Sequence, residues 1–306
     1  MYATFIALAG SLCWLALAQH LDKPPLENDL DYLQKGLLEY LDPVKSSYKQ
    51  WGRGWIPADC KTMTEQANFS AADVETFSVQ YDDCPNDPWI LCRHKDSPDP
   101  LGNMIDLFGR VPVRARQWVR HVINLPDPTM TYAYNWAGNI AMFDRINGDL
   151  TVFIHETGHS LDLLGAYPDK PLSNSTRWLA QYAHDSHVPD PYSQTNQRED
   201  VAQNTVVAAY DLNVWGGFGV VEPGWDKVFH QFDTIKLEQK KADNLLVRGG
   251  LCGKRLQNSE TVKVGGGSSR IRARGQGGPP DVGLSDGVDV IESVVFDTRE
   301  DCKHGS

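Results

Sequence analysis

The sequence predicts an α+β fold built around one main domain. The chain has 306 residues, of which 41% are hydrophobic, so it can bury a substantial core. Residues 129–146, "TMTYAYNWAGNIAMFDRI", are rich in aromatic and β-branched residues and predict one or two strands. They directly precede residues 150–164, whose apolar side chains recur at helical spacing. A strand region followed by a helix therefore forms the centre of the predicted fold.

The first eighteen residues, "MYATFIALAGSLCWLALA", are an uncharged apolar run that ends in the small residues Ala16 and Ala18. This run is too short to cross a bilayer comfortably, and its end is typical of a signal-peptide cleavage site. We therefore expect residues 1–18 to be a secretory signal peptide and the protein to be extracellular. A membrane anchor is the alternative reading, and it requires a longer run.

Removal of that segment leaves five cysteines, none of them in the CxxC pairs that suggest a thiolate metal site. In a secreted protein, disulfide bonds are the expected use. Because five is an odd number, at most two bridges form within the chain. We expect one bridge between Cys252 and Cys302, and another between two of Cys60, Cys84 and Cys92.

The sequence also contains signals for glycosylation and a net charge that limits the possible binding partners. The sequons at Asn68 and Asn174 predict N-glycosylation. A net charge of −11 argues against binding to nucleic acid or to an anionic membrane, since both need concentrated Lys and Arg. The one basic cluster, at Arg270, Arg272 and Arg274, lies in a Gly-rich stretch that we interpret as a solvated tail. We expect a monomer that acts on a peptide or protein substrate.

Apolar spacing and turn residues predict the elements before the centre of the fold. Leucines three and four residues apart predict a helix over residues 22–42, which Pro43 ends. Residues 51–100 contain three cysteines and several Pro- and Asp-rich turns, so we expect a disulfide-tied, loop-rich stretch with short strands. Residues 104–126 predict one helix that continues to Pro126.

The elements after the centre are predicted in the same way. We expect a helix near residues 175–186 and a second strong helix from about residue 196 to residue 212. From Gly249 the composition changes to Gly-rich, linker-like runs, so residues 251–306 are expected to form an appendage. Within this appendage "VDVIESVVF", residues 288–296, predicts one strand.

The sequence "TVFIHETGHSLDLLG", residues 151–165, contains the candidate chemistry. Asp149 can cap this helix and Gly165 can end it. His155 and His159 lie one turn apart on a face separate from the apolar one, so both imidazoles can reach one metal ion, for which Zn²⁺ is the expected choice. Glu156 lies close enough to hold a water at that metal. The alternative is an amphipathic helix whose solvent face happens to carry these residues.

A catalytic zinc site needs a third protein ligand. The spacing HExxHxxGxxH is excluded, because Asp162 and Gly165 stand at its last two defined positions. Glu199 is the best candidate and Asp200 its competitor, although Glu199 could instead form a capping box with Asn196 at the start of the second helix. Weaker candidates in a Pro-rich loop are His184 and His187.

The blocks "HETGHSLDLLGAY" and "PYSQTNQREDVAQ" resemble the gluzincin-type zinc peptidases of the anthrax lethal factor kind, over about residues 150–210. The resemblance implies a zincin-like α+β fold with a mixed sheet, an active-site helix and a second, ligand-bearing helix. It also implies His155, His159 and Glu199 as zinc ligands. Glu156 would be the general base, and Tyr192 would assist at the reacting carbonyl; the alternative for Tyr192 is a surface aromatic residue next to Pro191.

Asp162 also has a counterpart in that pattern, whereas Gln203 does not. We expect Asp162 to accept a hydrogen bond from a ligand histidine, with an exposed helix carboxylate as the alternative. Gln203 departs from the pattern, because the family often has an acidic residue there. In the zincin arrangement, the strand before the metal helix forms the edge of the cleft and pairs with substrate; residues 137–143 are placed for this by sequence order, or form an interior strand.

More loosely, the whole chain resembles secreted fungal proteins of the conidiation-specific type. Together these features predict a zincin-like catalytic domain over residues 19–250, followed by the appendage. The predicted function is that of a secreted zinc metalloendopeptidase. The alternatives are a secreted zinc-containing binding or structural protein without peptidase activity, and an enzyme that hydrolyses a non-peptide amide.

Overall fold

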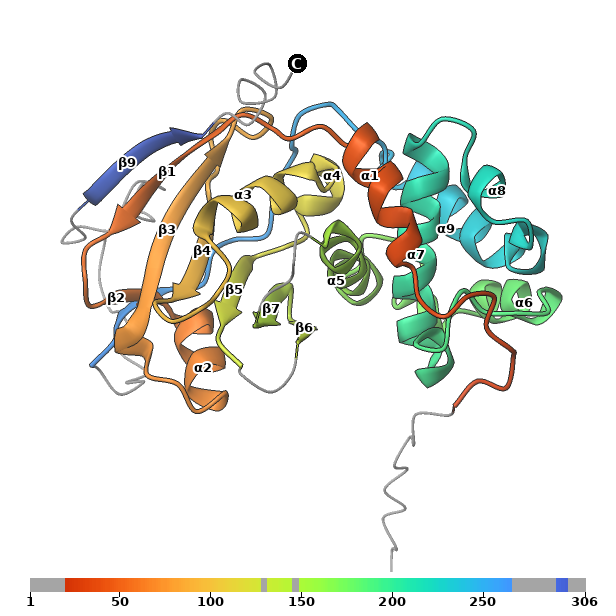
Figure 1. Ribbon diagram of the computed structural model, residues 1–306, viewed down its shortest axis with the longest axis horizontal. Helices are drawn as coiled ribbons and strands as arrows, with labels where there is room; N and C mark the ends of the chain where they lie inside the picture. Colours follow the sequence, from red (N-terminus) through yellow and green to blue (C-terminus); the bar gives the residue numbers. More distant parts are fainter. Residues whose placement is uncertain (1–19, 128–130, 145–148, 266–289, 297–306) are drawn as a thin grey trace, which may run out of the picture.

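A seven-stranded mixed sheet and a group of helices packed beside it form the protein in the computed structural model (Figure 1). The structure describes residues 20–127, 131–144, 149–265 and 290–296. The predicted α+β class with a mixed sheet is confirmed. The predicted signal peptide, the basic cluster at 270–274 and Cys302 lie outside the described residues.

The sheet has the strand order β6-β7-β5-β4-β3-β1-β9, and β4, β5 and β7 are parallel to one another. The other pairs are antiparallel. Its strands are β1 (Ser46–Trp51), β3 (Val74–Tyr81), β4 (Trp89–His94), β5 (His121–Leu125), β6 (Tyr132–Trp136), β7 (Asn139–Phe143) and β9 (Val290–Phe296). A separate pair joins β2 (Trp55–Pro57) to β8 (Thr261–Lys263). Thus β7, which holds most of residues 137–143, is an interior strand, and β6 is the edge next to it.

The α-helices are α1 (Gln34–Tyr40), α2 (Ala58–Gln66), α3 (Leu101–Arg110), α4 (Val113–Arg116), α5 (Leu150–Leu163), α6 (Thr176–His184), α7 (Gln197–Asn213), α8 (Phe218–Val221) and α9 (Phe229–Lys241). Single 3-10 turns are η1 (Asp31–Leu33), η2 (Ala71–Asp73), η3 (Leu172–Asn174), η4 (Ser193–Thr195) and η5 (Trp225–Lys227). Helices α3, α4 and α5 lie between the sheet and the remaining helices, whereas α2 lies near β2 and β5 (Figure 1).

Two hydrophobic cores lie on the two faces of the sheet, because successive side chains of a strand point to opposite faces. Leu91 of β4 and Val122 of β5 join the core that includes α1, α3, α5 and α7. Their neighbours Cys92 and Ile123 join the second core, which includes α2 and β2. The parallel strands are therefore buried on both faces, and they carry the helix α5 on one of them.

Two of the predicted helices are shorter than expected. Residues 20–30 form no helix, because this segment pairs with the loop before α7: the Leu26 amide donates to the carbonyl of Val188 at 2.9 Å. The helix predicted over residues 104–126 is wrong in its last part. It ends at Arg110, α4 follows Pro112, and residues 121–125 form β5. A strand buried on both faces lacks the alternation that would have marked it in the sequence.

The predicted disulfide pattern is half correct. Cys60 and Cys92 form a bridge, as expected for two of the first three cysteines. The expected Cys252–Cys302 bridge is wrong, because Cys252 is bonded to Cys84. The physical reason is the path of the chain after the helices: the Cys252 amide donates to the carbonyl of Asp83 at 2.9 Å, which places its thiol beside Cys84.

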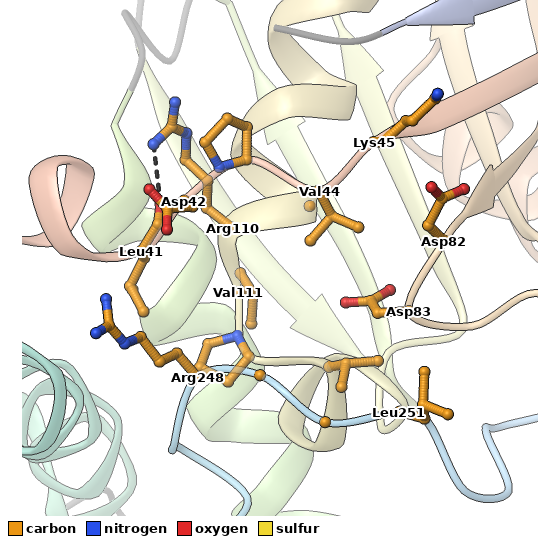
Figure 2. A pocket seen from close by; sticks show the side chains of 16 residues that line it. Leu41, Asp42, Val44, Lys45, Asp82, Asp83, Arg110, Val111, Arg248 and Leu251 are labelled. Carbon is orange, nitrogen blue, oxygen red and sulfur yellow. Dashed lines mark hydrogen bonds between the residues drawn. The ribbon is translucent and has the colours of Figure 1, made fainter. Parts of the chain in front are cut away.

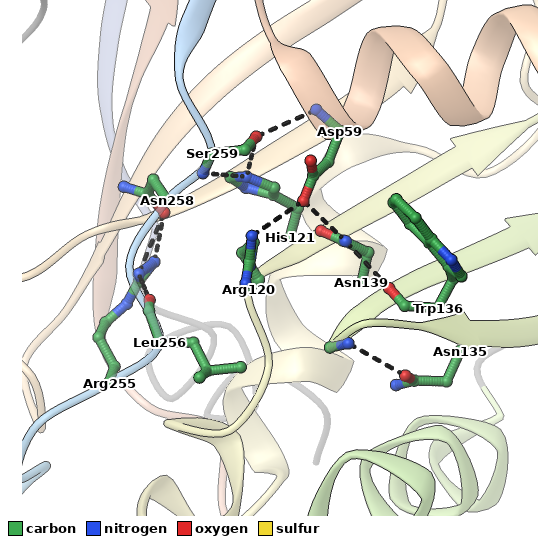
Figure 3. A network of polar contacts seen from close by, with 11 residues as sticks. Asp59, Arg120, His121, Asn135, Trp136, Asn139, Arg255, Leu256, Asn258 and Ser259 are labelled. Atoms are coloured by element: carbon green, nitrogen blue, oxygen red, sulfur yellow. Dashed lines mark hydrogen bonds and ion pairs between the residues drawn. The ribbon is translucent and has the colours of Figure 1, made fainter. Parts of the chain in front are cut away.

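The residues after Cys252 are held against the sheet by a polar network (Figure 3). Arg255 is buried and donates to Asn258 and to the carbonyl of Pro88. Ser259 donates its amide to Nε2 of His121, at the start of β5, at 3.0 Å. Residues 252–263, the beginning of the expected appendage, therefore pack on the main domain. The strand predicted in 288–296 is confirmed as β9.

Candidate metal centre

Helix α5 presents the two motif histidines in the way its sequence predicts. The Asp149 side chain caps it by accepting the Thr151 amide at 2.9 Å. Buried apolar residues such as Phe153 and Leu161 anchor the helix in the core. Strand β6 also holds the helix, because the Asn135 amide donates to the Glu156 carbonyl at 2.8 Å. The histidine-bearing face is therefore fixed between the sheet edge and α7.

Close packing of α5 on α7 brings the third residue to the site. A Cβ atom built on Gly158 would lie 3.1 Å from Cα of Ala202 and 3.1 Å from Cβ of Thr205, so a larger residue would force the helices apart. Asn196 caps α7 by accepting the amides of Arg198 at 2.8 Å and Glu199 at 3.2 Å. The cap thus sets the first turn of α7 directly opposite the histidines.

The ligand atoms of His155, His159 and Glu199 converge. Oε2 of Glu199 lies 3.3 Å from Nε2 of His155 and 3.1 Å from Nε2 of His159, and the two Nε2 atoms are 3.1 Å apart. Among the described residues, this is the one group of three or more His, Cys, Asp or Glu side chains whose ligand atoms lie within 4.8 Å of one another. The Glu199 carboxylate therefore faces the histidines rather than its own helix cap.

The chemistry of these donors fits a cation. Nδ1 of His155 lies 2.9 Å from Oε1 of Gln203, an acceptor, so Nδ1 carries the proton and Nε2 keeps its lone pair. Burial alone would raise the pKa of Glu199, but its contacts with the two histidines hold this pKa at about 2. A carboxylate and a lone pair that face each other at this distance repel unless a proton or a metal ion lies between them. Two imidazoles and one carboxylate are a common zinc donor set.

Glu156 is buried beside this group, and its Oε2 has no hydrogen-bond partner. Burial, together with the negative charge of Glu199, raises the pKa of Glu156 to about 7. Buried carboxylate oxygens are normally hydrogen-bonded, so this oxygen is free to accept a hydrogen bond from a water or a ligand in the adjoining pocket. Glu156 is therefore placed to exchange a proton with a ligand at the site.

Tyr192 lies at the mouth of the site, half-exposed, with its ring 5.5 Å from that of His155. Burial and the charges of Glu199 and Glu156 raise the pKa of Tyr192 to about 12. Its phenol is thus protonated at neutral pH and can donate a hydrogen bond. The predicted residues His155, Glu156, His159, Tyr192 and Glu199 all lie together.

Residues 28–304 match the protein family described as Con-13, conidiation-specific protein Con-13. The chain belongs to this family. It is also 34% identical over 182 residues to conidiation-specific protein 13 of Neurospora crassa, a match that covers 58% of this chain and 53% of that relative. The chain thus spans about half the length of the curated relative it matches. No solved structure matches this Con-13 family chain.

The predicted resemblance to conidiation-specific proteins is therefore confirmed for this Con-13 family member. The resemblance to zinc peptidases stays a prediction, and the family description names no reaction. No helix within the described ranges of the Con-13 chain has the length and apolar content needed to cross a membrane. The two predicted sequon residues, Asn68 and Asn174, are exposed.

The candidates weighed against Glu199 lie elsewhere in this Con-13 structure. Asp200 is fully buried and is bonded to Asn204 at 3.0 Å, and burial raises its pKa well above the usual range. The ring of His184 lies 5.4 Å from that of His230 in a tilted arrangement, and His187 contacts Ser186 at 2.9 Å. None of these side chains belongs to the converging group.

Asp162 is buried, and its Oδ1 accepts the Ser173 amide at 2.8 Å. Its other oxygen has no hydrogen-bond partner. Asp162 thus holds the η3 turn after α5, and the expected bond from a ligand histidine is not among its contacts in the described structure. The alternative of an exposed helix carboxylate is excluded by its burial.

One functional residue was missed in the sequence. Asp190 is buried, accepts both the amide and the hydroxyl of Ser193 at 2.9 Å, and also accepts the side-chain amide of Gln203. Gln203 in turn contacts His155, so Asp190 lies one residue behind this candidate ligand. The Pro-rich loop "VPDPY" offered no spacing signal for this role.

Two of the pockets in the described part of the structure bear on ligand binding. One, of about 370 Å³, reaches Glu156, His155 and Tyr192 and continues between the chain around Leu30 and strand β6. A larger pocket of about 570 Å³ lies between the Leu41–Lys45 segment and Gly250 (Figure 2). In this second pocket Arg110 is already committed to the carbonyls of Leu38 and Leu41, at 2.9 Å each. The smaller pocket is the one that meets the candidate metal centre.

Proposed function

We propose that the protein is a zinc-dependent hydrolase that cleaves peptide bonds. The observation that supports this proposal most is the unpartnered, buried Glu156 carboxylate beside three converging donors at the end of an open pocket. A purely structural zinc site has four protein ligands and is closed. Here three protein donors converge and a pocket leads to them, which supports a catalytic rather than a structural site.

His155, His159 and Glu199 would hold the zinc ion, which is consistent with their donor chemistry. When bound, zinc supplies a Lewis acid and makes a water at this site acidic enough to react near neutral pH. Glu156 accepts the proton of the attacking water at Oε2, and then delivers it to the leaving nitrogen. Tyr192 donates its phenolic hydrogen to the carbonyl oxygen as negative charge develops there, a contribution of about 3 kcal/mol in comparable sites.

Strand β6 is the element we propose to pair with an extended substrate. It is the edge strand next to α5, and the Asn135 side chain ties it to Glu156 and to Ser160 at 2.8 Å each. An edge strand offers unpaired backbone donors and acceptors to a peptide. The sequence predicted substrate pairing for residues 137–143. Because β7 is an interior strand, we assign substrate pairing to β6, residues 132–136, instead.

Secretion is part of the same proposal. Four of the five cysteines outside the predicted signal peptide form two disulfides, which persist in oxidising compartments. The two sequon asparagines are exposed, so they are accessible to glycosylation. Both features support an extracellular, glycosylated protein, and mass spectrometry of the protein from culture medium would test the cleavage after Ala18 and the glycans.

The test of the enzymatic proposal uses the purified full chain. Metal content is measured by elemental analysis, and hydrolysis of a denatured protein substrate is followed with and without a zinc chelator. Glu156→Gln should retain zinc and lose about 10²–10⁴-fold in rate, because it removes the proton acceptor without a ligand. Glu39→Gln, an exposed change on α1, is the matched control and should behave like the wild type.

Two results would contradict the proposal. If Glu156→Gln hydrolyses peptides at the wild-type rate, Glu156 is not the general base. If the wild type binds zinc but cleaves neither proteins nor peptides, the protein belongs to the alternative class of secreted zinc-containing binding or structural proteins. A panel of non-peptide amides in the same assay tests the other alternative: hydrolysis of these amides without cleavage of peptides would identify an enzyme that acts on a non-peptide amide.

A further inference from the structure

The pocket that reaches Glu156 has a second end, away from the metal centre. Its walls there are the chain segment Asn28–Asp31, the residues Tyr132 and Ala133 of β6, and the first turn of α5. Three carboxylates line this end: Asp29, Asp31 and Asp149. None of the residues that line the pocket, all of them in the described part of the chain, is lysine or arginine.

The three carboxylates lack a positive partner among their described contacts. Oδ1 of Asp149 accepts the neutral Thr151 amide at 2.9 Å, and Oδ1 of Asp29 accepts the neutral Asp31 amide at 3.0 Å. Partial burial and the charges of Asp149 and Asp29 raise the pKa of Asp31. The carboxylates thus repel one another, and a cation bound between them would relieve this repulsion.

A second, independent feature of the pocket points to a ligand. Glu156 lines the same pocket from its other end, is 3% exposed, and has an oxygen without a hydrogen-bond partner. The pocket therefore joins an acidic end to a buried acceptor beside the candidate zinc donors. A molecule that fills it would extend from the reacting bond to the acidic end.

The apolar part of the lining fits the stem of a long basic side chain. Leu30, Val152 and Ala133 line the same pocket as the three carboxylates, and an aliphatic chain can pack on such residues while its charged head reaches the carboxylates. A metal ion fits this end less well. Within the described chain, Asp29, Asp31 and Asp149 are not among the side chains that converge closely enough to hold an ion.

We propose that this pocket binds a cationic group of the substrate next to the bond that is cleaved, so that the enzyme prefers peptides with a positive charge at that position. The proposal rests on the proposed function for the position of the cleaved bond. The cationic group is an alkylammonium or guanidinium, supplied either by a lysine or arginine side chain or by the free amino terminus of the peptide.

The test measures binding separately from cleavage. Peptide libraries are randomised except at one position, which is lysine, its uncharged analogue norleucine, or glutamate, and all are acetylated at the amino terminus. A fourth library carries norleucine and a free amino terminus. Binding to Glu156→Gln protein as purified is measured by fluorescence polarisation, and cleavage is measured with the wild type.

We expect the lysine library to bind about tenfold more tightly than the norleucine library, because several partly exposed charge pairs add small contributions. Raised ionic strength should reduce this preference. The double variant Asp29→Asn/Asp31→Asn should lower it to about twofold by the same reasoning. Asp226→Asn removes one negative charge from an exposed side chain that does not line the pocket, and it should leave the preference intact.

The binding results distinguish the two sources of the cationic group. Tighter binding of the free-amino library alone assigns the pocket to a peptide amino terminus, whereas tighter binding of the lysine library assigns it to a side chain. Equal binding of all libraries, no binding at all, or a preference that survives in the double variant overturns the proposal. A lysine preference in binding without any cleavage by the wild type would keep the pocket and overturn the peptidase.

Discussion

Nδ1 of His155 lies 2.9 Å from Oε1 of Gln203, and the side-chain amide of Gln203 donates onward to Asp190. This contact fixes the tautomer of His155, so that its Nε2 lone pair faces His159 and Glu199. In many metal sites a carboxylate accepts a hydrogen bond directly from a ligand histidine. Here the neutral side chain of Gln203 lies between His155 and the carboxylate of Asp190.

Gln203→Leu should therefore lower zinc affinity by about 10–100-fold, since the imidazole loses the acceptor that orients it. Gln203→Glu keeps an acceptor for His155 but loses the donor to Asp190, so its zinc affinity should fall less than that of Gln203→Leu. Competition with a chromophoric chelator measures both affinities. The exposed change Gln66→Leu is the control, and unchanged affinity in Gln203→Leu would show that the contact does not orient His155.

The third ligand can be tested against its neighbour in the chain. Glu199→Ala should lose zinc during gel filtration, because it removes one of three converging donors. Asp200→Asn should keep zinc, because Asp200 points away from the histidines and contacts Asn204. Elemental analysis gives the zinc content of each variant, and full occupancy in Glu199→Ala would refute the assignment.

The close approach of α5 and α7 predicts a packing effect. Gly158→Ala places a Cβ 3.1 Å from Ala202 and Thr205; such overpacking typically costs about 1–3 kcal/mol of folding free energy, which we expect to outweigh the roughly 1 kcal/mol that alanine gains over glycine in a helix. The same shift of α7 should weaken zinc binding. Urea denaturation measures the stability change. Gly265→Ala, where no atom lies within 4 Å of the new Cβ, is the control; if the two variants are equally stable, the helices have room.

His121 predicts a pH dependence of stability. Burial, aided by Arg255 and Arg120, lowers the pKa of His121 to about 3. The unfolded chain takes up this proton below about pH 6.5 and the folded protein only below about pH 3. The unfolded state thus binds more protons between these values, so the free energy of unfolding falls as the pH is lowered through this window, by up to about 1.4 kcal/mol per unit from this group.

Denaturation at several pH values checks this window. His121→Gln should be less stable at neutral pH but should lose stability less steeply on acidification. His184→Gln, a change at an exposed histidine, should keep the wild-type slope. An identical slope in His121→Gln and the wild type would mean that His121 is not the group responsible.

The candidate site could be predicted from the sequence more completely than the fold. Helix α5 and its Asp149 cap could be predicted because spacing and capping are local properties of the chain. Strand β5 could not be, because residues 121–125 are buried on both faces by partners from other parts of the chain. The Cys84–Cys252 bridge was missed for a related reason, since its partners are 168 residues apart.

The sequence by itself determined which residues can carry the chemistry: HExxH places two imidazoles one turn apart, because the helical repeat requires it. Only the tertiary structure decided that Glu199, and not Asp200, meets those imidazoles, since this depends on how α7 is rotated and how closely Gly158 lets it approach. The tertiary structure also decided that Asp190 supports His155 and that Asp29, Asp31 and Asp149 share one pocket with Glu156. Contacts between distant segments depend on packing of the whole chain, which local spacing does not encode.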